Sequence, residues 1–317
     1  MASYNRSVRR FAKFAWVVLG FNILVILWGA LVRASRSGEG CGDHWPLCNG
    51  TVIPHAAQIA TLIEFTHRIT TAIAFLSVVV MAVWAFRRYR QELIWPAAAA
   101  SLGLIISEAL LGAGLVLFKF VGTDVSVGRV IYLSAHLINT LLMLAAMALT
   151  AWWASRNAPV RLRNVELRAV GPVIVCAVGI AVTGVVTALS DTLYPVSSLR
   201  AGFEADFAAA SPMLVKLRIW HPVIAILAGA YIVIAISRIE VAPRLRHMAM
   251  ALVGMELAAG MLNLFLLTPV WMQLIHLLLA DLLWIVLVLL SAAVLEESAV
   301  SKLSNRATEN RPLLSAQ

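Results

Sequence analysis

Residues 270–295 read VWMQLIHLLLADLLWIVLVLLSAAVL, an almost unbroken apolar run in which Asp281 is the one acidic residue. At about 1.5 Å per residue, a helix of roughly 20 residues crosses the ~30 Å hydrocarbon core of a bilayer, so this run is long enough to span a membrane. The chain contains eight such runs, and we predict that each forms a transmembrane helix. The predicted spans are 11–33, 61–86, 94–118, 130–153, 169–190, 213–237, 243–267 and 270–295.

The composition supports a membrane protein. Of the 317 residues, 61% are hydrophobic and 13% are charged, whereas about a quarter of the residues in soluble domains are charged. The runs lack the alternation of polar and apolar residues over roughly ten positions that a membrane β-barrel requires. A helix pairs its own backbone groups, as lipid demands. We therefore expect an all-α integral membrane protein.

The basic residues account for the formal net charge of +9. If the first helix starts in the cytoplasm, most of the 25 lysines and arginines fall in cytoplasmic segments. Cytoplasmic loops carry such an excess, so we expect both termini in the cytoplasm and the protein in a bacterial plasma membrane. This charge requires no nucleic acid partner, and membrane lipid is the expected surrounding.

The second half of the chain repeats landmarks of the first. The matching positions are Gly29 with Gly184, His67 with His221, Glu108-x-x-x-Gly112 with Glu256-x-x-x-Gly260, and His136 with His276. We predict two tandem four-helix bundles, 1–154 and 169–296, with a cytoplasmic linker, 155–168, and a disordered cytoplasmic tail, 297–317. Because each unit has an even number of helices, the units share one orientation and are related by a pseudo-twofold axis along the membrane normal.

Four histidines carry the main chemical signal. His67, His136, His221 and His276 each lie roughly six to eight residues past the outer entry of a predicted helix, or about 9–12 Å deep. An ionisable group at this depth needs a partner inside the bundle. Imidazoles on facing helices can hold a haem iron from both sides, with one haem in each half. A proton path and a copper or zinc site are the alternatives.

The two halves differ beside these histidines. Glu64 lies three residues before His67 and shares its helix face, whereas no carboxylate lies at the matching position before His221. A carboxylate at a haem edge could act as a base, stabilise positive charge or orient a ligand. Arg68 and Arg218 lie near the outer interface, where haem propionates would find cationic partners, although either side chain could instead snorkel to water.

The first outer loop and its flanking helices resemble the haem A synthase family. The segments that carry the resemblance are Gly29-Ala30-Leu31-Val32-Arg33, Ser37-Gly38-Glu39-Gly40-Cys41-Gly42-Asp43-His44-Trp45-Pro46-Leu47-Cys48-Asn49-Gly50 and Glu64-Phe65-Thr66-His67-Arg68. The resemblance implies a haem O substrate at His67 and His136, with Glu64 assisting the chemistry. It also implies a resident haem b at His221 and His276.

The family activity is oxidation of a haem O methyl group to the formyl group of haem A, for cytochrome oxidase biogenesis. The resemblance implies two successive oxidations through a hydroxymethyl intermediate, with an oxygen derived from water. It further implies that an electron acceptor and a haem O synthase are candidate partners. Whether the protein forms a homo-oligomer stays open. A disulfide between Cys41 and Cys48 is implied as well, either as a structural clip or as a redox-active pair.

Two other functions fit parts of the sequence. A two-haem b-type cytochrome would need the four histidines, and a haem carrier or transporter would add a proton-coupled path. Three intramembrane carboxylates, Glu108, Glu256 and Asp281, would suit such a path or could form interior hydrogen bonds. The presence of Glu64 in one half only and the paired-cysteine loop favour the synthase.

Overall fold

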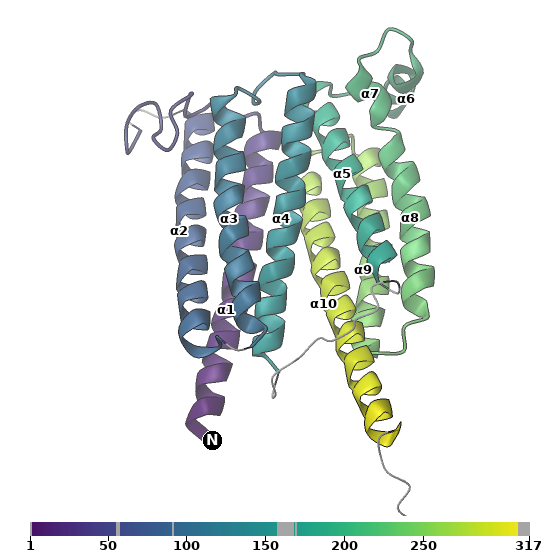
Figure 1. Cartoon of the computed structure of the whole chain (residues 1–317). Helices are drawn as coiled ribbons and strands as arrows, with labels where there is room; N and C mark the ends of the chain where they lie inside the picture. Colours follow the sequence, from purple (N-terminus) through teal and green to yellow (C-terminus); the bar gives the residue numbers. More distant parts are fainter. Residues whose placement is uncertain (1, 55–57, 91, 157–167, 169, 310–317) are drawn as a thin grey trace, which may run out of the picture.

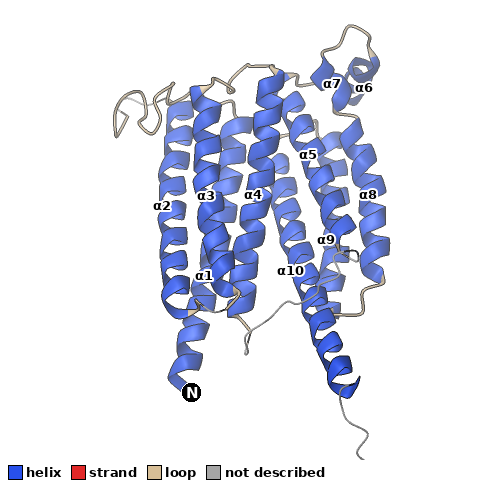
Figure 2. Cartoon of the chain, viewed as in Figure 1, coloured by secondary structure: helices blue, strands red, loops and turns tan. Residues whose placement is uncertain are grey.

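The computed structural model describes residues 2–54, 58–90, 92–156, 168 and 170–309. Within these ranges the regular elements are helices (Figures 1 and 2), apart from an isolated bridge between Cys48 and Thr51. Eight spans are long and apolar enough to cross a membrane, as predicted. They comprise α1 (Ala2–Ala34), α2 (Ile59–Arg88), α3 (Ile94–Leu117), α4 (Val127–Ala154), α5 (Gly171–Leu193), α7 (Met213–Leu217) together with α8 (Trp220–Ser237), α9 (Pro243–Phe265) and α10 (Val270–Glu309).

The predicted spans begin and end within three residues of the apolar spans of the structure, which start at Arg9 within α1 and stop at Glu296 within α10; the largest differences include Val127 against a predicted start at 130. Local chemistry explains where several helices begin. The Ser126 hydroxyl caps α4 by accepting a hydrogen bond from the backbone N–H of Arg129 at 3.2 Å. Pro243 occupies the first turn of α9, where a helix needs no N–H donor.

The sixth predicted span contains a break. Helix α7 ends at Leu217 and α8 begins at Trp220, two residues before Pro222. Proline lacks an N–H and is tolerated in the first turn of a helix but not in its interior, so the helix restarts just before it. The preceding loop also contains α6 (Leu199–Phe207), which the sequence analysis does not predict.

The predicted tail 297–317 differs from the structure. Its first part, residues 297–309, continues α10 as a helix instead of being disordered. This part contains neither Gly nor Pro, the two residues that are least favourable inside a helix. Residues 310–317 and most of the predicted linker 155–168 lie outside the described residues.

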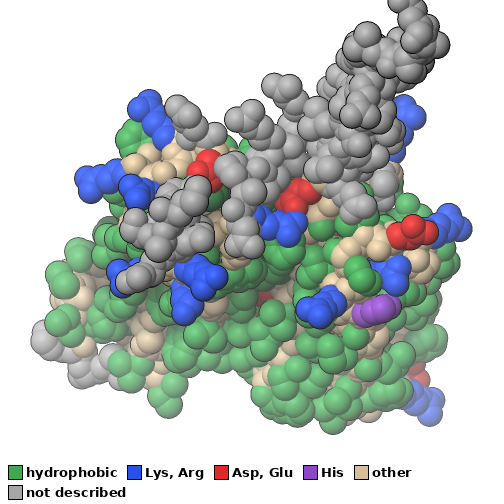
Figure 3. All heavy atoms as spheres, turned by 90° about the horizontal axis from the view of Figure 1, so that it is seen from below, with side chains coloured by type: hydrophobic (Ala, Val, Ile, Leu, Met, Phe, Trp, Pro, Cys, Tyr) green, Lys and Arg blue, Asp and Glu red, His purple; other side chains and the backbone are tan. Residues whose placement is uncertain are grey.

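Helix α1 begins and α10 ends at the same end of the bundle (Figure 1). Seen from that end, Lys and Arg side chains lie around a largely hydrophobic surface (Figure 3). Both observations suit the predicted orientation with this end in the cytoplasm. The orientation itself stays a prediction.

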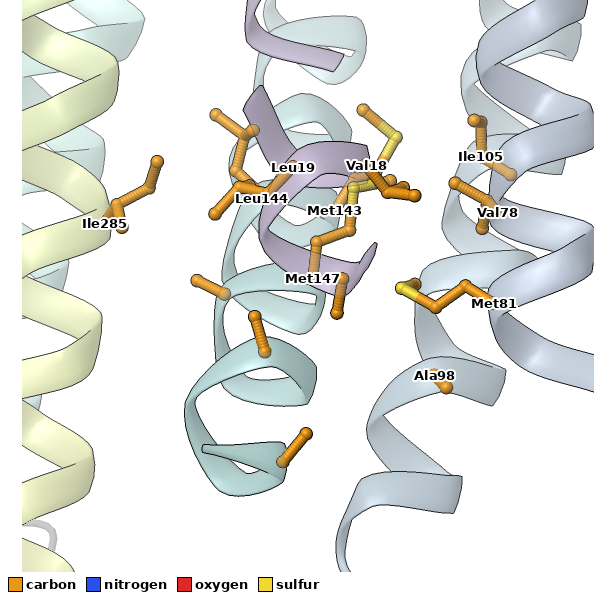
Figure 4. Close-up of a cluster of buried hydrophobic side chains, with 14 of the residues drawn as sticks. Val18, Leu19, Val78, Met81, Ala98, Ile105, Met143, Leu144, Met147 and Ile285 are labelled. Carbon is orange, nitrogen blue, oxygen red and sulfur yellow. The ribbon is translucent and has the colours of Figure 1, made fainter. Parts of the chain in front are cut away.

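Two clusters of buried apolar side chains form the core. The larger contains buried side chains of α1, α2, α3, α4 and α10, among them Val18, Val78, Ile105, Leu144 and Ile285 (Figure 4). The smaller joins α5, α8 and α9 to the opposite side of α10. Because lipid is as apolar as these side chains, close van der Waals packing stabilises the contacts. Helix α10 therefore belongs to both cores and holds the predicted halves together.

Arg33 joins the predicted halves at the opposite end of the bundle. Its Nη1 donates to the carbonyl oxygen of Ala188 and to Oγ1 of Thr192, both at 2.8 Å. Its Nη2 donates to Oε1 of Gln273 at 3.2 Å. One side chain of α1 thus contacts both α5 and α10, which positions the two groups of histidines relative to each other.

Candidate functional site

Each of the four candidate ligand histidines packs against a glycine on the membrane helix before it. The pairs are Gly29 of α1 with His67 of α2, Gly112 of α3 with His136 of α4, Gly184 of α5 with His221 of α8, and Gly260 of α9 with His276 of α10. A β-carbon added at Gly29, Gly184 or Gly260 would lie 3.0–3.1 Å from Cε1 of its histidine, and 4.0 Å at Gly112. Small residues let membrane helices approach closely, and here they make room for an imidazole ring.

In the N-terminal half, Glu108 of α3 faces the second histidine. Nδ1 of His136 lies 3.3 Å from Oε2 of Glu108. That oxygen also accepts a hydrogen bond from Nδ2 of Asn139 at 2.6 Å, and the hydroxyl of Thr140 donates to Oε1. The three α4 side chains lie within two turns of one another, so one helix surrounds the carboxylate with His136, Asn139 and Thr140.

The first histidine of this half is held differently. Nδ1 of His67 is buried and has no hydrogen-bond partner among the described residues. His67 and His136 lie close enough to interact electrostatically. Nδ1 of His136 also has no aligned hydrogen bond among the described residues, so the two rings differ in that His136 lies beside the carboxylate of Glu108.

In the C-terminal half, both histidines have polar neighbours at Nδ1. Oγ1 of Thr183 lies 3.1 Å from Nδ1 of His221. Oε1 of Glu256 lies 3.2 Å from Nδ1 of His276. Partners at Nδ1 leave Nε2 of each ring available, which is the arrangement that metal-ligating histidines usually adopt.

The separation of His221 and His276 fits an iron between them. Two imidazoles bound to one iron at about 2 Å each would have ring centroids roughly 6 Å apart. The observed centroid separation is 6.3 Å. The residues present in this half therefore suit a haem held by two axial imidazoles. Among the described residues, no group of three or more His, Cys, Asp or Glu side chains could hold a metal ion.

The loop between α1 and α2 contains the implied disulfide between Cys41 and Cys48. Glu64 of α2 is buried and accepts a hydrogen bond from the backbone N–H of Cys41 at 2.8 Å. Arg68, one turn further along α2, pairs with Glu64 and donates to the carbonyl oxygen of His44 at 2.7 Å. Glu64 and Arg68 thus attach the disulfide loop to the helix that carries His67.

Further polar contacts hold this loop at the outer rim. The hydroxyl of Thr61 donates to the carbonyl oxygen of Gly40 at 2.8 Å. Nζ of Lys119, between α3 and α4, lies 2.9 Å from Oδ2 of Asp43. This hydrogen bond raises the pKa of the exposed Lys119 above its usual value. The loop is therefore attached to both α2 and the α3–α4 connection.

Arg218, the second candidate for propionate contact, is buried in an internal network. Its Nε pairs with Oδ1 of Asp206 and its Nη2 donates to the carbonyl oxygen of Gly202 at 2.9 Å. Nη1 lies 3.7 Å from Oδ1 of Asp191. In this structure Arg218 attaches α6 to the start of α8, as Arg68 attaches the disulfide loop to α2.

The structure brings together residues to which the sequence analysis assigns no definite role. Glu108 and Glu256 face histidine rings, Thr183 faces His221, and the four glycines accommodate the rings. The repeat contained a signal for part of this arrangement. Glutamate and histidine recur together in both halves, and only their contact requires the tertiary structure.

Comparison with known proteins adds family evidence. A family model described as "Cytochrome oxidase assembly protein" (COX15-CtaA) matches residues 12–288. A Thermus thermophilus protein named "Protoheme IX farnesyltransferase" is 44% identical over 303 residues, which cover 92% of this chain and 49% of that protein. The chain therefore spans about half the length of this relative.

Shorter matches connect the chain with proteins named "Heme A synthase". The Alkalihalophilus pseudofirmus protein is 43% identical over 97 residues, covering 30% of this chain and 33% of the relative. The Shouchella clausii protein is 45% identical over 100 residues, covering 30% of this chain and 32% of the relative. Each of these matches covers about a third of either chain.

Proposed function

The chain belongs to the cytochrome oxidase assembly protein family COX15-CtaA, and from this we propose that it is a haem A synthase that oxidises a methyl group of haem O to a formyl group. The observation that carries the proposal is the difference between two otherwise matching histidine pairs. Nδ1 of His221 lies 3.1 Å from Oγ1 of Thr183, whereas Nδ1 of His67, at the matching position, has no hydrogen-bond partner among the described residues. A resident haem needs ligands that are held in a fixed orientation. A substrate haem must dissociate after the reaction, so it needs a ligand that binds its iron less firmly.

We assign the resident haem b to His221 and His276 in the C-terminal half, and haem O to His67 and His136 in the N-terminal half. Bound haem b would supply one-electron transfer, carrying electrons from the substrate site towards an acceptor. The protein orients the imidazoles through Thr183 and Glu256 and excludes bulk solvent with the surrounding apolar helices. The histidine pairs of the two halves are related by the proposed pseudo-twofold axis.

The proposed oxidation has two stages. A methyl group gains one oxygen from water to become a hydroxymethyl group, and each stage removes two electrons and two protons from substrate and water together. The second stage converts the alcohol to the aldehyde. Acid–base groups and an electron acceptor must take up these protons and electrons.

Glu64 is the candidate catalytic residue of the N-terminal half. Its carboxylate is buried one turn from His67, and it already accepts hydrogen bonds from Cys41 and Arg68. Because both oxygens of this carboxyl group already accept hydrogen bonds, we favour stabilisation of positive charge at the oxidised substrate over proton abstraction. The same contacts give Glu64 a second task, which is to hold the disulfide loop over α2.

We propose that the disulfide is a structural clip. Cys41 is 0% exposed and Cys48 is 1% exposed. Thiol–disulfide exchange with a partner requires a thiolate to reach one of the sulfurs. Burial of both cysteines favours the clip over a redox-active pair.

The long Thermus relative suggests where the substrate originates. Its printed name describes transfer of a farnesyl group to protohaem, and about half of its length has no counterpart in this chain. We propose that the farnesyl transfer belongs to that other half. A protohaem farnesyltransferase would then be the haem O synthase that supplies this protein.

Pigment analysis of the purified full-length protein tests the proposed function. Co-expression with a protohaem farnesyltransferase should yield haem B together with haem O, its hydroxymethyl product and haem A, as separated and weighed by mass spectrometry. Haem B alone, with no oxidised product under co-expression, would identify a b-type cytochrome instead. Unaltered haem O bound without any product would identify a carrier.

A further inference from the structure

Helices α3 and α9 carry the same short motif, Glu108-x-x-x-Gly112 and Glu256-x-x-x-Gly260. Residues four apart lie on one face of a helix, one turn from each other. In each motif that face meets a histidine ring of the next membrane helix. The glutamate lies near Nδ1 of the ring and the glycine lies near Cε1, so both contact the same imidazole from one side.

The C-terminal copy shows the arrangement most closely. Oε1 of Glu256 is 3.2 Å from Nδ1 of His276, and a β-carbon at Gly260 would lie 3.1 Å from Cε1 of the same ring. Nδ1 of His276 is buried and has no aligned hydrogen bond within the described part of the chain. A modest rotation of the imidazole about its broad χ2 torsion would align an N–H with the carboxylate.

We propose that Glu108 and Glu256 are positioning residues, each accepting a hydrogen bond from Nδ1–H of its histidine so that Nε2 faces the haem iron. This inference rests on the proposed function, because it takes His136 and His276 as axial ligands. A carboxylate partner fixes the tautomer and orientation of a ligating imidazole and makes it a stronger electron donor. Stronger donation stabilises ferric iron and lowers the reduction potential of the haem.

The two glutamates differ in the number of other hydrogen bonds that their side-chain oxygens accept. Asn139 donates a hydrogen bond to Oε2 of Glu108, and Thr140 donates one to Oε1. Both of these hydrogen bonds compete with His136 for the carboxyl group. Oε2 of Glu256 is buried without a hydrogen-bond partner among the described residues. Fewer hydrogen bonds therefore compete with His276 for Glu256, and the effect of Glu256 on the haem should be larger than that of Glu108.

The test compares reduction potentials and haem retention in purified full-length protein. Glu256→Gln keeps the shape of the side chain and removes its charge. We expect it to retain haem, to shift the potential of one haem to a more positive value and to alter its low-spin spectrum. Haem transfer to excess apomyoglobin should accelerate by roughly 10-fold or more, the loss of affinity typical when such a partner is removed.

Three further variants distinguish positioning from other effects. Asp281→Asn replaces another buried carboxyl group, five residues past His276 on α10, and controls for the loss of a buried carboxyl group alone. Gly254→Ala lies two residues before Glu256, where an added β-carbon meets nothing within 4 Å, and controls for substitution on α9. Glu108→Gln should shift the haem of the other half in the same direction but by less.

The outcomes separate this inference from the proposed function. If Glu256→Gln matched the wild type in potential, spectrum and transfer rate, or if Asp281→Asn caused an equal shift, the positioning role would be wrong. Formation of haem A by the wild type would still support the synthase. A wild-type protein that purified without any haem would overturn both.

Discussion

A β-carbon at Gly29 of α1 would lie 3.0 Å from Cε1 of His67 on α2. The corresponding distance from Gly184 to Cε1 of His221 is 3.1 Å, so the same relationship occurs in both halves. Real β-carbons rarely approach another atom this closely. The absence of a side chain at these positions thus determines where the candidate ligand rings can lie.

Alanine at these glycines should displace the rings. Gly184→Ala would force His221 or α5 to move, and overpacking of this kind costs about 1–3 kcal/mol. We expect loss of the resident haem, measured as the haem-to-protein ratio of purified protein. Gly179→Ala on the same helix, where an added β-carbon meets nothing within 4 Å, is the matched control and should retain haem. Equal haem content in both variants would contradict the role of Gly184.

Histidine and Glu64 variants should separate binding from chemistry. His221→Ala and His276→Ala remove the proposed axial ligands and should abolish resident haem b, as seen by absorption spectroscopy. Glu64→Ala should leave that haem bound, because Glu64 belongs to the other half, yet should abolish haem A formation. Full activity of Glu64→Ala would show that its carboxylate serves only to attach the loop.

Loss of Glu64 should also loosen the disulfide loop. Its carboxylate accepts the backbone N–H of Cys41, and leaving a buried donor unpaired costs about 1–3 kcal/mol. We expect faster hydrogen exchange at the amides around Cys41 in Glu64→Ala, whereas amides of α8 and α9 should exchange at wild-type rates. Exchange that increased equally in all helices would indicate general destabilisation.

Burial of the disulfide predicts resistance to reduction. Because Cys41 and Cys48 are almost fully buried, a water-soluble thiol should reduce the bond slowly in the folded protein and rapidly after denaturation. Mass spectrometry of the alkylated cysteines measures both rates. Equally fast reduction in the folded state would favour the redox-active pair.

Arg33 should stabilise the contact between the two halves. Replacing it with Met keeps most of the apolar stem but removes hydrogen bonds to Ala188, Thr192 and Gln273. Hydrogen bonds from charged groups contribute about 1.5–3 kcal/mol each, so Arg33→Met should lower the thermal unfolding midpoint in detergent. Lys216→Met, a substitution of a half-buried cation whose Nζ donates to the carbonyl oxygen of Ala209, should change it far less. Equal midpoints for Arg33→Met and wild type would argue against this contribution.

The sequence by itself determined the membrane class, the eight spans and their approximate ends. Lipid imposes strong constraints, since a spanning segment must be apolar, about 20 residues long and paired along its own backbone. The repeat of His67, His136, His221 and His276 could be recognised for the same reason, because polar residues are rare in such segments. Three features were not predicted: the break before Pro222, the helix α6 and the extension of α10. Short elements and helix ends depend on local caps and packing, which hydropathy does not specify.

Only the tertiary structure decided which side chains meet. The positions of Glu108 and Glu256 in the sequence are compatible with a proton route or with interior hydrogen bonds. Their approach to His136 and His276 depends on the rotation of α3 and α9 about their own axes. The same holds for Thr183, for the glycines against the rings and for the loop attached to Glu64. Hydropathy specifies that a helix lies in the membrane, whereas side-chain packing between helices specifies which face of it reaches the site.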